Sequence, residues 1–253
     1  MLTVRVIPCL DVRDGSVVKG VRFQNLREAG DPAGLSKRYG QEGADEIVVL
    51  DVSATPEGRA TALDTVRAVR EQLAIPLTVG GGVNSVERAR DLLEAGADKI
   101  SVNTAAVSRP ALVRELAMQF GPQCVVLAVD AAASKRSKSG FEVVVRSGTE
   151  RTGLDAREWA KTGVDAGAGE ILLTSFDRDG TREGYDLDLI AGIREVVPVP
   201  IIASGGASTP EHMAEAVDAG ADAVLAASIF HESEWTVHAL KDRLTTLGVE
   251  VRR

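Results

Sequence analysis

The sequence predicts a closed (β/α)8 barrel, the TIM-barrel architecture, with a two-fold internal repeat of half-barrels. Short, continuously apolar segments alternate with longer amphipathic ones along all 253 residues. Continuous apolar runs are typical of parallel strands that are buried on both faces, and about 250 residues is the usual size of one such barrel. The third observation is an internal sequence repeat. An open, doubly wound sheet is the alternative fold.

Eight strand candidates follow one another in the chain, most of them rich in Val, Ile and Leu. Amphipathic segments lie between them. Those at 85–96 and 210–220 carry apolar residues at three- and four-residue spacing and end in glycine, which is typical of helices. Eight units in register favour a closed barrel. The expected strands are 4–10, 46–51, 76–82, 99–103, 125–130, 170–175, 200–206 and 223–228.

The internal repeat indicates a duplicated half-barrel. Residues 79–105 match residues 203–229 without a gap at an offset of 124, and the AGAD at 95–98 recurs at 219–222. Units two to four thus return as units six to eight, which predicts halves of about 1–123 and 124–253. Asp11 maps onto Asp130 at an offset of 119 instead. This difference predicts an insertion within 131–153, interpreted as a small exposed hairpin.

Composition argues against several classes of partner and cofactor. The formal net charge of −8 is unfavourable for nucleic acid or an anionic membrane surface, both of which bind basic faces. No apolar run reaches membrane-spanning length, and the N-terminus does not resemble a signal peptide. The 2 cysteines form no CxxC, and the 3 histidines show no metal-binding spacing. We therefore expect free thiols, a cytoplasmic protein, no metal and no cofactor.

Two aspartates are the candidate catalytic groups. Asp11 ends the first strand and Asp130 the fifth, and these two strands face each other across a barrel of eight. In this fold the reactive groups lie at the C-terminal ends of the strands. Two carboxylates facing one cavity suit a general acid and a general base. The alternative is that each Asp only caps the loop that follows it.

Glycine-rich turns predict two anion sites. GGGVNS at 80–85 follows strand three and SGGAST at 204–209 follows strand seven, each at the start of a helix. Main-chain amides there can bind phosphate without lysines. Hydrogen-bonding groups at the next strand ends, 103–104 and 227–228, add to the two sites. Because the repeat places the sites on opposite sides, the cavity is expected to hold a long bisphosphate.

Two long loops and one charged cluster have both functional and structural interpretations. Segment 12–31 is long for a loop, so it suggests a lid in which Lys19 closes over the ligand, or else Lys19 is an ordinary solvated lysine. Segment 176–186 brings Asp177 and Asp179 near Thr174 as substrate contacts, or else forms a capping turn. Charged residues at strand starts predict either a salt-bridged plug or a gate at the N-terminal mouth: Arg5, Glu46, Lys99 and Glu170.

Six segments resemble one enzyme family over essentially the whole chain. They are IPCLDVRDGSVVKGVRFQNLREAGDP, TVGGGVNS, ADKISVNTAAV, GAGEILLTSFDRDGTREGYD, IIASGGAS and ADAVLAASIFH, and they are similar to the cyclase subunit of imidazole glycerol phosphate synthase. The resemblance implies that ammonia attacks a phosphoribulosyl-formimino-aminoimidazole-carboxamide ribotide. The products are imidazole glycerol phosphate and aminoimidazole carboxamide ribotide. The substrate has a phosphate at each end.

The resemblance also implies roles for individual residues and a protein partner. Asp11 and Asp130 match the catalytic pair, as acid and base respectively, and Lys19 matches a mobile-loop lysine. A glutaminase subunit would dock at the N-terminal face to form a heterodimer, with Asp98 at the interface and Arg5, Glu46, Lys99 and Glu170 as the ammonia gate. The implied substrate and phosphate contacts are Gly82, Asn103, Thr104, Thr174, Asp177, Asp179, Gly180, Ser204, Gly206, Ala227 and Ser228. Segment 131–153 departs from the family by being longer and more basic.

Two other functions remain open at this stage. The sister isomerase of the same pathway is also a two-fold barrel for a bisphosphate, but the CLDV opening, the VVKG loop and the charged ring argue against it. A catalytically idle scaffold is a second alternative, which the intact Asp pair disfavours. One physical condition applies to the cyclase. A free Asp has a pKa of about 3.9, so either the site raises the pKa of Asp11 or Asp11 starts ionised.

Overall fold

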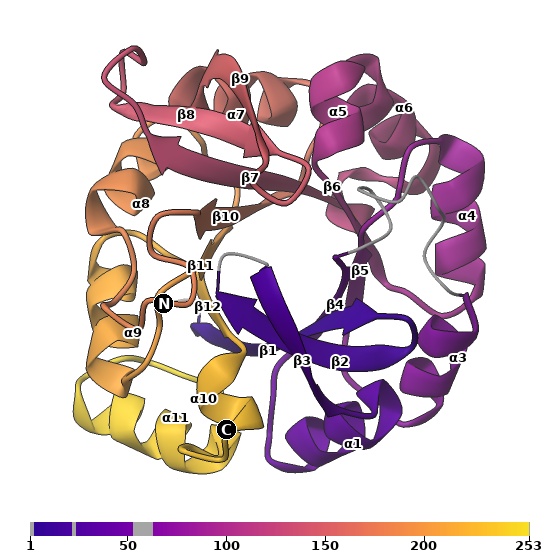
Figure 1. Cartoon of the computed structure of the whole chain (residues 1–253), viewed down its shortest axis with the longest axis vertical. Helices are drawn as coiled ribbons and strands as arrows, with labels where there is room; N and C mark the ends of the chain where they lie inside the picture. Colours follow the sequence, from indigo (N-terminus) through magenta and orange to yellow (C-terminus); the bar gives the residue numbers. More distant parts are fainter. Residues whose placement is uncertain (1–2, 22–23, 53–62, 253) are drawn as a thin grey trace.

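Eight of the apolar segments pair side by side into a closed parallel barrel surrounded by helices (Figure 1). The structure is a computed structural model that describes residues 3–21, 24–52 and 63–252. Pairing between β7 and β10 completes the ring, so the closed barrel is confirmed and the open sheet is wrong. The barrel strands are β1 (Arg5–Arg13), β4 (Ile47–Asp51), β5 (Leu77–Gly80), β6 (Lys99–Val102), β7 (Val125–Ala133), β10 (Glu170–Ser175), β11 (Ile201–Ser204) and β12 (Ala223–Ala226).

Helices pack around the outside of the barrel (Figure 1). The two helices expected at 85–96 and 210–220 are confirmed as α4 and α9, which begin after Ser85 and Thr209. Each of these hydroxyls accepts a hydrogen bond from a first-turn amide, which fixes where the helix starts. The helices are α1 (Pro32–Gln41), α3 (Leu63–Glu71), α4 (Val86–Glu94), α5 (Thr104–Ser108), α6 (Ala111–Phe120), α7 (Ala156–Asp165), α8 (Leu187–Arg194), α9 (Pro210–Asp218), α10 (Ser228–His231) and α11 (Val237–Thr246), with a 3-10 turn η1 (Pro122–Cys124). Across the described ranges, no helix has the length and apolar character needed to span a membrane.

The strands are continuously apolar because both of their faces are buried. One face packs against the helices, and the other fills the barrel interior with residues such as Ile7, Val48, Val126 and Ile202. Successive side chains point to opposite faces of a strand. In β1, therefore, Ile7, Cys9 and Asp11 share the inner face, and the Asp11 carboxylate follows two buried side chains.

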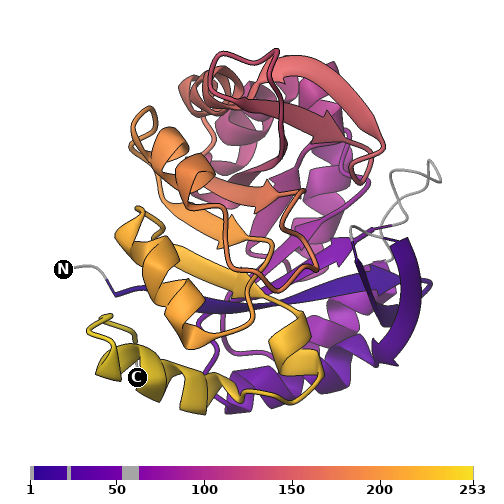
Figure 2. The ribbon, with the colours of Figure 1, turned by 60° about the vertical axis from the view of Figure 1, so that its left-hand side comes forward.

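Both segments that interrupt the repeat form antiparallel hairpins. Segment 12–31 was expected to be a long loop, and this is wrong for its described part, while its role as a lid stays a prediction. It forms β2 (Ser16–Val21) and β3 (Gln24–Gly30), paired to the end of β1. In segment 131–153 the hairpin is confirmed, as β8 (Phe141–Val145) and β9 (Glu150–Asp155) on β7. It is not simply exposed, because Val143 and Val145 pack into the core with Trp159. Figure 2 shows both hairpins at the same end of the barrel.

The element boundaries recur at the offset of the sequence repeat. β5 and β11, β6 and β12, and α4 and α9 each coincide when 124 is added. The two halves also contain the same ion pair. Arg70 Nη1 lies 2.9 Å from Asp98 Oδ2, and Arg194 Nη1 lies 2.9 Å from Asp222 Oδ2. These matches support the duplication, while the division near residue 123 stays a prediction.

A buried lysine ties the C-terminal helix to the N-terminal end of the barrel. In α11, Lys241 is only 7% exposed, and its Nζ lies 2.7 Å from Asp45 Oδ2. The ammonium also donates to the carbonyl oxygens of Gly43 and Arg252. Asp45 in turn accepts a hydrogen bond from the Val6 amide at the start of β1. One ammonium group therefore links α11, the last residues of the chain and the α1–β4 connection.

We expect Lys241→Met to destabilise the protein by about 2–5 kcal/mol, because it leaves the buried Asp45 carboxylate without its countercharge. Lys161→Met is the matched control. Lys161 pairs with Asp165 on the surface of α7, and exposed pairs contribute about 0–1 kcal/mol. Urea unfolding of both variants measures the difference. Equal losses of less than 1 kcal/mol would contradict the role given to Lys241.

Candidate active site

A cavity of about 330 Å³ opens at the C-terminal ends of the strands. Its apolar lining residues, among them Cys9, Ala128, Leu172 and Leu225, belong to the core inside the barrel. Its other walls are polar and come from strand ends and the loops after them. The structure brings these residues expected at the site to one cavity: Asp11, Gly82, Asn103, Thr104, Asp130, Thr174, Asp179, Gly180, Ser204, Gly206, Ala227 and Ser228.

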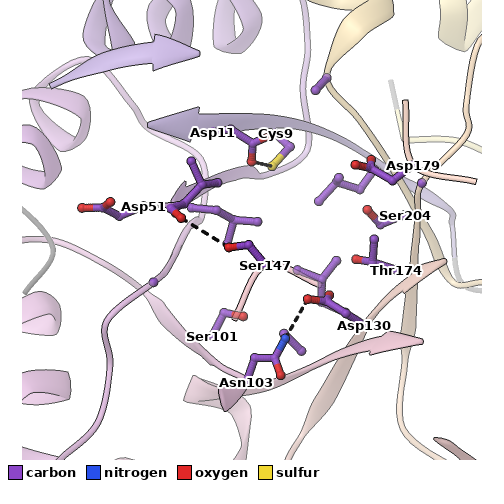
Figure 3. Close-up of a pocket in the computed structure, with 18 of the residues that line it drawn as sticks. Cys9, Asp11, Asp51, Ser101, Asn103, Asp130, Ser147, Thr174, Asp179 and Ser204 are labelled. Atoms are coloured by element: carbon purple, nitrogen blue, oxygen red, sulfur yellow. Dashed lines mark hydrogen bonds between the residues drawn. The ribbon is translucent and has the colours of Figure 1, made fainter. Parts of the chain in front are cut away.

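Asp11 and Asp130 face the cavity from opposite sides (Figure 3). Asp11 lies near the end of β1, where the Cys9 thiol approaches its Oδ1 at 3.7 Å. Asp130 lies in β7, and its Oδ2 accepts a hydrogen bond of 2.8 Å from Asn103 Nδ2. The pair therefore has the opposed geometry that the sequence predicted, although the two carboxylates have different neighbours.

Burial raises the pKa of both Asp11 and Asp130 to about 7. The negative charge of Asp179 adds to both upward shifts, and Asp130 adds further to that of Asp11. Opposing them, the Cys9 thiol favours ionisation of Asp11, while Thr174 and Asn103 favour ionisation of Asp130 through hydrogen bonds. With a pKa near neutrality, each group can release or accept a proton at physiological pH.

The loop after β10 separates the two aspartates that were expected to contact substrate. Asp179 lines the cavity and acts electrostatically on both Asp11 and Asp130. By contrast, Asp177 accepts a 2.7 Å hydrogen bond from the Ala133 amide at the end of β7 and is not among the residues that line this cavity. Asp177 therefore fixes the loop against β7 and does not cap a helix through this bond, while its contact with the substrate stays a prediction.

Two glycine turns have the same geometry on opposite sides of the cavity. Gly81 and Gly205 adopt φ values of 94° and 92°. A Cβ atom at these positions would lie 2.3 Å from the Asp51 carbonyl oxygen and 2.7 Å from that of Ser175, respectively. Asp51 and Ser175 are themselves related by the offset of 124. Both turns therefore require glycine, since the left-handed backbone and the close carbonyl each exclude a side chain.

The short helices α5 and α10 begin without side-chain caps. Asn103 precedes α5 but donates to Asp130 instead, and Ala227 precedes α10 without a polar side chain. By contrast, Ser85 and Thr209 cap the longer helices that follow the glycine turns. First-turn amides commonly bind a capping side chain, and at the starts of α5 and α10 no such side chain accepts from them. Thr104 Oγ1 already accepts a hydrogen bond from the Arg146 amide.

Several lining residues were missed by sequence reasoning. Asp51 and Ser101 could have been found from the sequence. Asp51 ends β4, as Asp11 ends an apolar run, and Ser101 lies at two-residue spacing between Lys99 and Asn103 along β6 and its end. No comparable signal exists for Ser147 and Arg182. They reach the cavity from turns in which they adopt φ values of 56° and 68°. The side chain of Lys19, a residue of β2, lies outside the described part.

The four charged residues expected at the N-terminal mouth form a closed ring. Arg5 pairs with both Glu46 and Glu170, with 2.7 Å between its Nη1 and Glu46 Oε2. Lys99 Nζ lies 2.9 Å from Glu46 Oε2 and 2.8 Å from Glu170 Oε2. Glu46 also accepts a 2.6 Å hydrogen bond from the buried Thr78 hydroxyl. In this arrangement the charges are fully paired, as a plug or a closed gate requires.

Asp98 lies half exposed near this end of the barrel, paired with Arg70 and bound to the Leu77 amide. Its repeat equivalent, Asp222, makes the same contacts with Arg194 and the Ile201 amide. These contacts give Asp98 a structural role. Within the described ranges, no cluster of three His, Cys, Asp or Glu side chains is suited to hold a metal ion.

The chain matches the family model described as "Histidine biosynthesis protein" over residues 5–236. It is 59% identical over 252 residues to a protein of Corynebacterium urealyticum, covering 100% of this chain and 99% of that one. A Thermobifida fusca protein is 56% identical over 254 residues, covering 99% of both chains. An Exiguobacterium sibiricum protein is 54% identical over 252 residues, covering both chains completely. Each of these relatives is named imidazole glycerol phosphate synthase subunit HisF.

The relatives match this chain over its full length, and the family model covers every barrel strand. Together with the closed barrel and the cavity at its C-terminal end, these matches show that the chain belongs to the histidine biosynthesis protein family, as an enzyme of the HisF type, the cyclase subunit of imidazole glycerol phosphate synthase.

Proposed function

We propose that this chain uses ammonia to convert phosphoribulosyl-formimino-aminoimidazole-carboxamide ribotide into imidazole glycerol phosphate and aminoimidazole carboxamide ribotide. Asp11 and Asp130 act as the acid and base. The observation that carries the proposal is their geometry: two carboxylates with a pKa of about 7 face one cavity between two equivalent glycine turns.

The two turns account for a substrate with a phosphate at each end. One end would be bound by main-chain groups near Gly82 and the start of α5, with Asn103 and Thr104 beside it. The other end would be bound near Gly180, Gly206 and the start of α10 at Ser228. All of these residues line the cavity. Charge-assisted hydrogen bonds of this type contribute about 1.5–3 kcal/mol each, so a few amides suffice to hold each phosphate.

The different neighbours of Asp11 and Asp130 support different roles for the two residues, one as the acid and the other as the base. Asp130 receives hydrogen bonds from Asn103 and Thr174, which stabilise its ionised form. Asp11 receives only a weak donor, the Cys9 thiol, and the charges of Asp179 and Asp130 oppose its ionisation. Asp130 is therefore the better resting base, which takes a proton as the nitrogen of ammonia forms its bond. Asp11 is the better resting acid, which donates a proton to the departing amine.

The charged ring and the barrel interior suit the entry of ammonia from a partner. Apolar side chains surround the interior between the ring and the cavity, and a neutral molecule crosses such a region more easily than ammonium. We propose that a glutaminase subunit docks at the N-terminal face, with Asp98 at its edge, and that this heterodimer opens the ring of Arg5, Glu46, Lys99 and Glu170. The cytoplasm is the expected compartment, since both cysteines are free thiols.

The reaction itself tests the proposal. The chain alone, given the ribulosyl ribotide and an ammonium salt, should form both products without any partner. An isomerase would consume only the aldose isomer of this substrate, and an idle scaffold would consume neither compound. Either of those two results would reject the proposed function.

We expect Asp11→Asn and Asp130→Asn each to lower kcat by about 10²–10⁴, which is the usual contribution of general acid–base catalysis. Asp165→Asn is the control, because Asp165 pairs with Lys161 on the surface of α7. Steady-state rates with saturating ammonium measure the loss. A wild-type rate in either cavity variant would remove that aspartate from the mechanism.

The raised pKa values also determine how stability depends on pH. An unfolded Asp has a pKa near 3.9, so between about pH 4 and pH 7 Asp11 and Asp130 bind more protons in the folded protein than in the unfolded chain, and their contribution to stability decreases with rising pH. Asp130→Asn removes one of these groups. We expect the free energy of unfolding of this variant to exceed that of wild type. This excess should be larger at pH 8 than at pH 5, by on the order of 1–3 kcal/mol.

Urea unfolding of wild type and Asp130→Asn at the two pH values measures this difference. The same change in stability at pH 5 and pH 8 would mean that Asp130 ionises in the folded protein as readily as in the unfolded chain.

A further inference from the structure

The described lining of the cavity carries far more negative than positive charge. Asp11, Asp51, Asp130 and Asp179 all line it, and Arg182 is the one basic residue among the lining residues that the structure describes. A bisphosphate ligand brings further negative charge into this space. Main-chain amides supply only partial positive charge, so a guanidinium at the cavity is of direct consequence for binding.

Arg182 is held in an unusual conformation beside the second glycine turn. It lies in the connection between β10 and α8 and adopts φ +68°, a left-handed conformation that is costly for a residue with a side chain. The Ser208 hydroxyl donates to its carbonyl oxygen at 2.9 Å. Two residues further on, the Gly184 amide donates to the Gly206 carbonyl oxygen at 2.9 Å. These two bonds fix the backbone of Arg182 against the turn that follows β11.

The guanidinium of Arg182 is paired with two carboxylates at the far end of α10. Its Nη1 lies 3.4 Å from Glu232 Oε2, and its Nη2 contacts Glu234. Glu232 directly follows α10, and Ser228 begins that helix. Four helical residues span only about 6 Å. The guanidinium is thus tied to the residue that directly follows α10, and the first residue of the same short helix, Ser228, lines the cavity.

We propose that Arg182 binds the substrate phosphate at the rim formed by Gly206, Ala227 and Ser228, and that Glu232 and Glu234 hold its guanidinium beside this site until the phosphate replaces them. The inference deepens the proposed function and rests on it for the identity of the bisphosphate.

The exchange of partners is physically reasonable. The side chains of Arg182, Glu232 and Glu234 are 42%, 30% and 37% exposed, and ion pairs this exposed are weak. A phosphate offers a guanidinium a higher charge and two parallel hydrogen bonds. Arg178 provides a contrast. It lies in the same loop and pairs with Glu183 at 3.3 Å, but it does not line the cavity.

An NMR titration of the full chain with inorganic phosphate tests the inference one rim at a time. The amides of Gly206 and Ser228 report on one rim, while those of Gly82 and Thr104 report on the other. We expect Arg182→Met to weaken phosphate binding at the first rim about 10- to 100-fold and to leave the second unchanged. Arg182→Lys should fall between this variant and wild type, and Arg178→Met should match wild type.

The double variant Glu232→Gln/Glu234→Gln gives a change of opposite sign. If the two carboxylates only hold Arg182 in reserve, removing their charge should tighten phosphate binding about two- to fivefold. If Arg182 instead serves only to fasten the loop to α10, both the Arg182→Met and the double variant would loosen the same rim. Thermal unfolding confirms that each variant is folded.

The outcomes separate this inference from the proposed reaction. Phosphate binding at Gly206 and Ser228 that is unchanged in Arg182→Met, or weakened in the double variant, overturns the role of Arg182. No phosphate binding at this rim in wild type overturns it as well. If wild type binds phosphate at both rims but forms no product, the proposed reaction fails, while the titration still decides the role of Arg182. For an active enzyme, Arg182→Met should raise KM far more than it lowers kcat.

Discussion

Three carboxylates share one partly desolvated cavity, and the rest of the structure has to tolerate their mutual repulsion. Asp11 lies in β1, Asp130 in β7 and Asp179 in the loop after β10. Only the folding of these distant segments brings the three charges together. Burial, with the added repulsion from Asp179, holds the pKa values of Asp11 and Asp130 near neutrality, which acid–base chemistry requires. The same repulsion opposes folding at neutral pH. The ion pairs that connect separate elements of the barrel, such as Lys241–Asp45 and the repeated Arg–Asp pairs, lie away from this cavity.

The two ends of the barrel handle charge in opposite ways. At the N-terminal mouth two cations and two carboxylates neutralise each other in a closed ring. At the C-terminal mouth four aspartates line the cavity with Arg182 as the single cation in the described lining. Mutual pairing of the four charges favours a stable closure at the N-terminal mouth, whereas the excess of carboxylates among the described lining residues favours proton transfer at the C-terminal mouth. The proposed passage of ammonia would connect a neutral entrance with an acidic site.

The internal repeat is symmetric at the two glycine turns, where we propose that the phosphates bind, and asymmetric around Asp11 and Asp130. Gly81 and Gly205 approach equivalent carbonyl groups in equivalent turns. On the inner face of β6, however, the residues are Lys99, Ser101 and then Asn103, whereas the equivalent positions of β12 and its end carry Ala223, Leu225 and Ala227. The duplicated scaffold thus supplies two equivalent turns, one for each end of the proposed bisphosphate. The polar residues of one half supply the ring lysine and the amide that holds Asp130.

The sequence by itself determined the closed barrel, the repeat and the residue types at each strand end, because alternating burial and glycine turns leave a local pattern in the chain. The hairpin in segment 12–31 was not anticipated from the sequence, although β1 and β2 pair across the two-residue Asp14-Gly15 turn, a local contact that such a turn favours. Nor did the sequence separate Asp177 from Asp179, which are two residues apart but bind a backbone amide and line the cavity, respectively. The raised pKa values and the position of Arg182 were decided only by folding, since both depend on charges from distant segments meeting in a space with little water.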